Sequence, residues 1–177
     1  MKWIGISGGW RRINEKIEND VRSVVAEIME RGDGVVSGGA LNVDSVCLDE
    51  AMKHDPLCER IKVFLPTTLE KFIEHYRKHA DWGDITTDQA ENLISQLTEV
   101  KRINQSALIE NPNTDFTEEN KLEHYYDRNS DIVGASDGLV AFRVKTKDSE
   151  GLGTADTVEK AKAKGIPVDL HFYDLSL

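Results

Sequence analysis

The sequence contains little cysteine. Its 177 residues include only two, Cys47 and Cys58, and their spacing is not that of a metal-binding pair. This count excludes a small disulfide-rich scaffold, and it is typical of a protein whose thiols stay reduced. We therefore expect two free thiols and a cytoplasmic protein.

Long apolar runs are also absent. No stretch approaches the roughly 20 apolar residues that a membrane-spanning helix needs. The segment from Met1 to Ile6 is too short, and too interrupted by glycine, to serve as a signal peptide. We expect no association with a membrane.

Positive charge is scarce as well. The chain has 22 Lys and Arg against 32 Asp and Glu, a formal net charge of −10. Nonspecific binding to nucleic acid needs a basic surface. The composition therefore disfavours nucleic acid as a partner, although it is compatible with a local basic cleft. The length, without internal repeats or low-complexity segments, predicts a single domain over 1–177.

Short apolar runs alternate with stretches of helical periodicity at both ends of the chain. This alternation predicts an α/β, Rossmann-like, doubly wound sheet of about five parallel strands in the order 3-2-1-4-5. The expected strands are 3–7, 35–36, 61–65, 139–142 and 166–172.

The middle of the chain departs from this rhythm. We interpret residues 67–127 as a helical insertion after the third strand. Thr86 and Gln89 have the spacing of a capping box and predict a helix that extends as far as Ile109. Thr117 predicts a further short helix that ends near Tyr126, before a separate helix over 127–133.

Three glycine-bearing loops each follow an expected strand and precede an expected helix. They are Ser7-Gly8-Gly9, Ser37-Gly38-Gly39 and Gly151-Leu152-Gly153-Thr154. The carboxyl ends of parallel strands share one edge of a sheet, so the loops can converge on one crevice. Free N–H groups at helix starts favour anions there. We predict a phosphate-bearing ligand; the alternative is three plain strand-to-helix turns.

Two familiar phosphate motifs are missing. No loop has the G-x-G-x-x-G pattern, and none ends in the Gly-Lys-Ser/Thr of a Walker A loop. An ordinary Rossmann dehydrogenase or P-loop hydrolase is thereby disfavoured.

Other residues near these loops are candidates. Trp10 can stack on a base or simply pack, and Arg11 and Arg12 can add positive potential at a ligand. His75 and His79 have the i, i+4 spacing of a metal pair, but no glutamate follows His75 in the zincin manner. We interpret them as part of a charged helix face and predict no metal site.

The ordered motifs resemble those of the SLOG superfamily. They run from Ser37-Gly38-Gly39-Ala40-x-x-x-Asp44 through Arg128-Asn129 and Ser136-Asp137-Gly138 to Gly151-x-Gly-Thr154-x-x-Thr157. That Rossmann-like group includes DprA (Smf) DNA-processing proteins and LOG phosphoribohydrolases, and the chain is most similar to its small stand-alone members. The resemblance covers 1–66 and 127–172.

The resemblance implies a nucleotide ligand, such as an AMP-like nucleotide, NAD or ADP-ribose, and a homodimer. It implies that Asp44 lies near a ribose; a favourable charge in a first helical turn is the alternative. It places Arg128 and Asn129 at the phosphate, although Arg128 can instead bridge neighbouring acids. The hydroxyls of Thr154 and Thr157 either meet phosphate or cap the helix.

The chain departs from the family pattern in three places. Asn42 stands where glycine is usual, and we expect it to take a left-handed backbone. Thr157 replaces the glutamate that serves glycosidic cleavage in LOG enzymes, and Glu150 replaces a proline. If the chain is an N-glycosidase, Asp156 or Glu159 is the nearest acid. The runner-up functions are thus a nucleotide N-glycosidase and an accessory, DprA-like DNA-processing protein.

Overall fold

A computed structural model describes residues 1–177 and confirms an α/β, Rossmann-like fold. The sheet has six parallel strands. Its central strands are β1 (Trp3–Gly8), β2 (Gly34–Ser37) and β5 (Gly138–Lys145); β3 (Ile61–Phe64), β4 (Leu108–Ile109) and β6 (Val168–Asp174) lie outside them. The order across the sheet is β4-β3-β2-β1-β5-β6. The predicted five-strand order is therefore confirmed.

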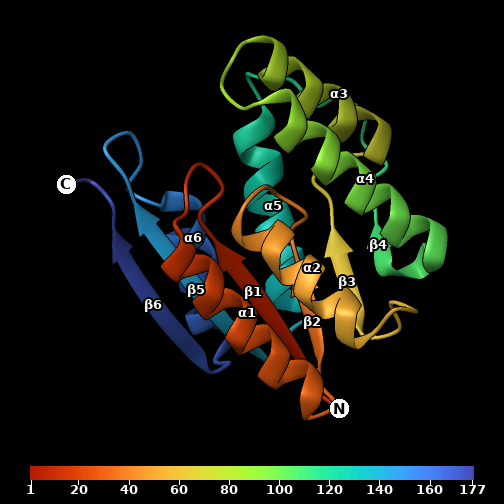
Figure 1. Ribbon diagram of the computed structural model, residues 1–177, viewed down its shortest axis with the longest axis vertical. Coiled ribbons are helices and arrows are strands. Elements are labelled where there is room, and N and C mark those ends of the chain that lie inside the picture. Colours follow the sequence, from red (N-terminus) through yellow and green to blue (C-terminus); the bar gives the residue numbers. More distant parts are fainter.

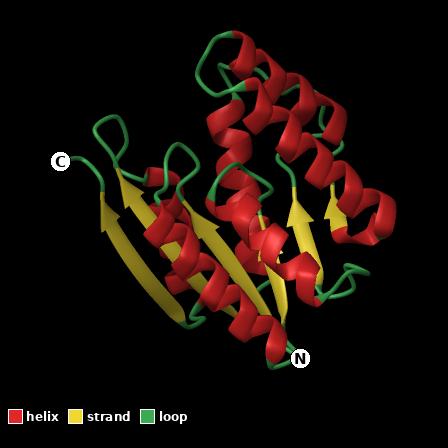
Figure 2. Cartoon of the chain, in the orientation of Figure 1, coloured by secondary structure: helices red, strands yellow, loops and turns green.

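Helices cover both faces of the sheet (Figures 1 and 2). On one face α1 (Glu15–Glu30) packs against α2 (Val43–His54). On the other, α5 (Lys121–Gly134) packs against α6 (Leu152–Lys164). No helix is both long and apolar enough to cross a membrane.

The helix α1 shows how apolar residues at helical spacing pack a helix against the sheet. Asn14 caps its start by accepting a hydrogen bond from the N–H of Ile17 at 2.9 Å. Ile17, Val21 and Val25 follow at helical spacing and are fully buried, each contributing about 1.5–3 kcal/mol of hydrophobic stabilisation. The helix ends before Gly32, whose φ of +86° is costly for other residues.

The middle segment holds α3 (Leu69–Asp81) and α4 (Thr87–Ile103), which pack together, with α3 beyond the carboxyl ends of the strands (Figure 1). The predicted capping box is present: Thr86 accepts from the N–H of Gln89 at 3.1 Å, and the Gln89 side chain accepts in return at 2.9 Å.

Two expectations for this segment are wrong. The helix α4 stops at Ile103, and a 3₁₀ turn (Gln105–Ala107) leads into β4 (Leu108–Ile109), an added edge strand on β3. The two helices expected on either side of residue 127 are one continuous helix, α5. The expected end of the helical insertion at residue 127 therefore falls inside α5. Thr117 lies in the turn before α5, where it accepts from the N–H of Asn120.

Buried apolar side chains fill both faces. The larger cluster lies under α1–α4, and a smaller one lies between α5, α6 and the sheet. Cys47 and Cys58 belong to the larger cluster, and both are free thiols, as predicted.

Candidate functional site

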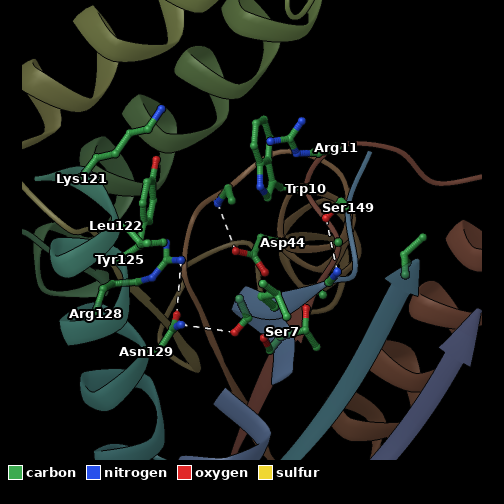
Figure 3. Close-up of a pocket in the computed structure, with 18 of the residues that line it drawn as sticks. Ser7, Trp10, Arg11, Asp44, Lys121, Leu122, Tyr125, Arg128, Asn129 and Ser149 are labelled. Atoms are coloured by element: carbon green, nitrogen blue, oxygen red, sulfur yellow. Dashed lines mark hydrogen bonds between the residues drawn. The ribbon is translucent and has the colours of Figure 1, made fainter. Parts of the chain in front are cut away.

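A cavity of about 280 Å³ opens beside the carboxyl ends of β1 and β5 (Figure 3). Strand order reverses between these two strands, because β2 and β3 lie to one side of β1 and β6 lies beyond β5. Open α/β sheets bind ligands at this switch point. The remaining walls come from α3 and α5 and from the start of α6.

Most of the predicted site residues line this cavity. They are Gly8, Gly9, Trp10, Arg11, Asp44, Arg128, Asn129, Gly151, Gly153 and Thr154. Four others, Ser37, Gly38, Gly39 and Thr157, lie outside it.

The loop after β1 forms the upper wall (Figure 3). A Cβ at Gly8 would lie 2.5 Å from the Val43 side chain, so the start of α2 packs directly against this glycine. Trp10 is 40% exposed, and the Arg11 guanidinium carbon lies 5.0 Å from the centre of its ring. The Asn42 side-chain amide donates to the Trp10 carbonyl and ties this loop to the one after β2.

Asn42 has a positive φ of 63°, as a residue in the place of a glycine needs, but its ψ of −109° lies outside the left-handed helical region that we expected. The loop that it ends binds a carboxylate of the chain itself, because the N–H of Ala40 donates to Asp44 Oδ2 at 3.1 Å. Ser37 is fully buried, and its hydroxyl accepts from the N–H of Gly39 at 3.3 Å. The turn therefore directs its polar groups inward.

Asp44 is buried and is the only acidic residue that lines the cavity. Burial raises the pKa of its carboxyl to about 6, against the opposing effects of the Arg128 charge and of backbone N–H groups. A carboxyl with a shifted pKa in a cavity is typical of a functional site.

Arg128 extends from α5 over the glycine turn (Figure 3). Its Nη1 donates to the Gly38 carbonyl at 2.7 Å, and its Nη2 donates to Asn129 Oδ1 at 3.4 Å. The guanidinium carbon lies 5.0 Å from the centre of the Tyr125 ring. Its Nε is buried without a hydrogen-bond partner, and no carboxylate lies within 4.0 Å of the guanidinium nitrogens. The cation thus retains capacity for an anion.

The start of α6 differs from expectation. The helix begins at Leu152 after a left-handed Gly151, so Thr154 lies in the first turn and does not cap it. No protein group accepts a hydrogen bond from the N–H groups of Leu152, Gly153 and Thr154. All three residues line the cavity. Free first-turn N–H groups at the positive end of a helix dipole form an anion site.

Two further predicted residues secure this helix start. Asn129 donates to the Gly153 carbonyl at 3.3 Å and to Asp156 Oδ2 at 3.1 Å. Thr157 is fully buried, and its hydroxyl donates back to the same Gly153 carbonyl at 3.1 Å.

The two catalytic candidates, Asp156 and Glu159, lie outside the cavity. Asp156 accepts from Asn129 and from Lys160 Nζ, the latter at 2.6 Å. Glu159 is on the exposed face of α6, 3.7 Å from the ammonium of Lys162.

Sequence reasoning missed Lys121 and Tyr125, which line the cavity from the same face of α5 as Arg128. Residues spaced by three and four positions share one face of a helix, so this spacing could have linked them to Arg128. The sequence alone did not show that one helix begins as early as Lys121. With them, the cavity holds four cationic side chains, Arg11, Arg12, Lys121 and Arg128, against one acid, in a chain of net charge −10. The site is therefore a local basic cleft.

The fold is similar to those of three solved structures. DNA processing protein A from Helicobacter pylori, which has a unique single-stranded DNA binding mode, has a TM-score of 0.65 and 19% identity over 96% of this chain and 64% of its own. DNA processing protein A (DprA) from Streptococcus pneumoniae has a TM-score of 0.56 and 17% identity over 96% and 50%. The protein TM1055 has a TM-score of 0.52 and 15% identity over 95% and 72%.

These likenesses establish a shared fold. The chain spans about two thirds of the first of these proteins and half of the second. No protein-family model matches the chain, and no curated sequence matches it.

Proposed function

We propose that the chain binds a nucleotide or nucleotide derivative in this cavity. The observation that carries the proposal is the half-buried Arg128, whose Nε lacks a partner, in the same cavity as the free first-turn N–H groups of α6. Both are donors suited to a phosphate. An AMP-like nucleotide, NAD and ADP-ribose share this group.

The other walls suit the rest of a nucleotide. Trp10 is exposed enough to stack on a base, and Tyr125 and Tyr126 offer further aromatic surface. Asp44 is the acceptor available to a ribose hydroxyl. The shared fold supports the SLOG superfamily, and a homodimer remains a prediction.

An N-glycosidase acting on nucleotides is the second candidate. It is favoured by Asp44, since a carboxyl with a pKa of about 6 exchanges protons near neutral pH. If the chain is this hydrolase, Asp44 is a better candidate than Asp156 or Glu159. Release of free base from nucleoside monophosphates, and its loss in Asp44→Asn, would establish the activity.

An accessory DNA-processing role is the third candidate. Its support is the basic lining of the cavity and the similarity to a protein that binds single-stranded DNA. A gel shift with single-stranded DNA that weakens steeply with salt would favour it over binding of a free nucleotide.

A thermal-shift screen tests the leading proposal. We expect AMP, NAD or ADP-ribose to raise the melting temperature by several degrees, because ligand at 100 times Kd adds about 2.7 kcal/mol to the free energy of unfolding. If no nucleotide shifts the transition, the proposal is wrong. Single-stranded DNA in the same screen distinguishes the DNA-processing role from nucleotide binding, because only that role predicts a larger shift with DNA than with a free nucleotide.

A further inference from the structure

Three side chains able to ligate a metal meet where α3 packs against the turn before α5. His75 and His79 are one turn apart on α3, and Glu118 lies in the turn. One ligand atom from each of the three lies within 4.8 Å of the others. The fold thus brings a carboxylate to the histidine pair from a distant part of the chain.

The distances suit a tetrahedral ion. His79 Nε2 lies 3.4 Å from Glu118 Oε1, and His75 Nδ1 lies 3.5 Å from the same oxygen. Ligands about 2.0–2.1 Å from a tetrahedral Zn²⁺ are separated by about 3.3–3.4 Å. Little movement is needed to bring the three atoms around one ion.

Outer hydrogen bonds orient both rings. His79 Nδ1 lies 2.7 Å from Asp84 Oδ2, so the N–H on that side donates to the carboxylate and the Nε2 lone pair faces the cluster. His79 is 8% exposed, and its Nε2 is buried with no hydrogen-bond partner. His75 Nε2 lies 3.2 Å from the Tyr125 hydroxyl, which leaves Nδ1 for the cluster. Metal-bound histidines almost always have such partners.

The Glu118 carboxylate keeps one oxygen for the cluster. Lys121 Nζ donates to Oε2 at 2.5 Å, and Oε1 is the atom that faces the two histidines. Two imidazole nitrogens and one carboxylate oxygen are a donor set that Zn²⁺ accepts in proteins.

We propose that His75, His79 and Glu118 bind one divalent transition-metal ion, with Zn²⁺ the best match to two imidazoles and a carboxylate. This contradicts the sequence-based expectation of no metal, because the spacing on α3 alone omits Glu118. Three protein ligands leave a fourth position for water or another oxygen, as in catalytic zinc sites. Both histidines also line the cavity. The proposal does not depend on nucleotide binding.

Zinc titration tests the site. Protein treated with a chelator and then freed of it is titrated with ZnCl₂ in a calorimeter at pH 7.5. We expect one Zn²⁺ per chain with a Kd below about 1 μM, and at least a tenfold weaker Kd in Glu118→Gln. His124→Gln, a histidine on α5 outside the cluster, is the matched control and keeps the wild-type Kd.

Two further measurements complete the test. Circular dichroism melts of the metal-free proteins must coincide, which separates loss of the site from loss of the fold. The Co²⁺ form should show the strong visible absorption of a tetrahedral site, and Glu118→Gln should lose it. Weak wild-type binding, unchanged binding in Glu118→Gln, or equal loss in His124→Gln would each overturn the proposal.

Discussion

The Arg128 guanidinium lies directly over Gly38, and its Nη1 donates to the Gly38 carbonyl at 2.7 Å. A Cβ at residue 38 would approach the guanidinium carbon to 2.7 Å and Asp44 Oδ2 to 3.0 Å. The absence of a side chain at Gly38 therefore fixes where the main cation of the cavity lies.

Gly38→Ala is expected to displace Arg128. Because Asp44 is buried and Arg128 is half-buried, the crowding should cost about 1–3 kcal/mol of the free energy of unfolding and weaken nucleotide binding at least tenfold. Urea denaturation and calorimetry measure the two effects. Gly134→Ala is the matched control, since no atom lies within 4 Å of a Cβ there, and it should leave binding unchanged.

Asp44 should make stability depend on pH. Its pKa rises from 3.8 to about 6 on folding, so between these values the unfolded chain has lost a proton that the folded protein keeps. The contribution of Asp44 is therefore fully present below about pH 4 and is lost as pH rises through 6.

The comparison with Asp44→Asn isolates this effect. Between pH 4 and pH 7 the free energy of unfolding of the wild type should fall relative to the variant by roughly 3 kcal/mol. Urea denaturation at several pH values measures it. A constant difference would mean that Asp44 is not buried as described.

The capping box predicts a stability change without a functional one. Thr86→Ala removes the acceptor for the N–H of Gln89 and should cost about 1 kcal/mol of the free energy of unfolding. Thr117→Ala, in an exposed turn, should cost less than about 0.5 kcal/mol. Equal losses of stability in the two variants would contradict a stabilising role of the Thr86 cap. Altered nucleotide binding in Thr86→Ala would contradict the expectation that this cap does not affect the cavity.

Local signals explain why much of the fold could be predicted. Both bounds of α2, Val43 and His54, follow from a glycine turn before it and the end of its apolar periodicity. The strand β4 could not be found, because its two residues are too few to show a period. The sequence predicts two helices in place of α5, because the polar residues around Asp127 interrupt the apolar periodicity of this single helix.

In the candidate site, too, some features have a local sequence signal and others do not. The glycine loops are local motifs, and their meeting at one sheet edge follows from strand order. That Arg128 covers Gly38, and that Glu118 meets His79, depends on how α5 packs against distant elements. No spacing along the chain encodes these contacts, so the structure was needed to find them.

The central claim is that Arg128 binds the phosphate of a nucleotide. Titration calorimetry with AMP, NAD and ADP-ribose, on the wild type and Arg128→Gln, tests it most directly. Arg102→Gln, which alters an exposed arginine paired only with Glu99, is the control. We predict that at least one nucleotide binds the wild type and the control equally and binds Arg128→Gln at least tenfold more weakly, since a charge-assisted pair is lost. Equal binding by all three proteins, or by none, would contradict the account.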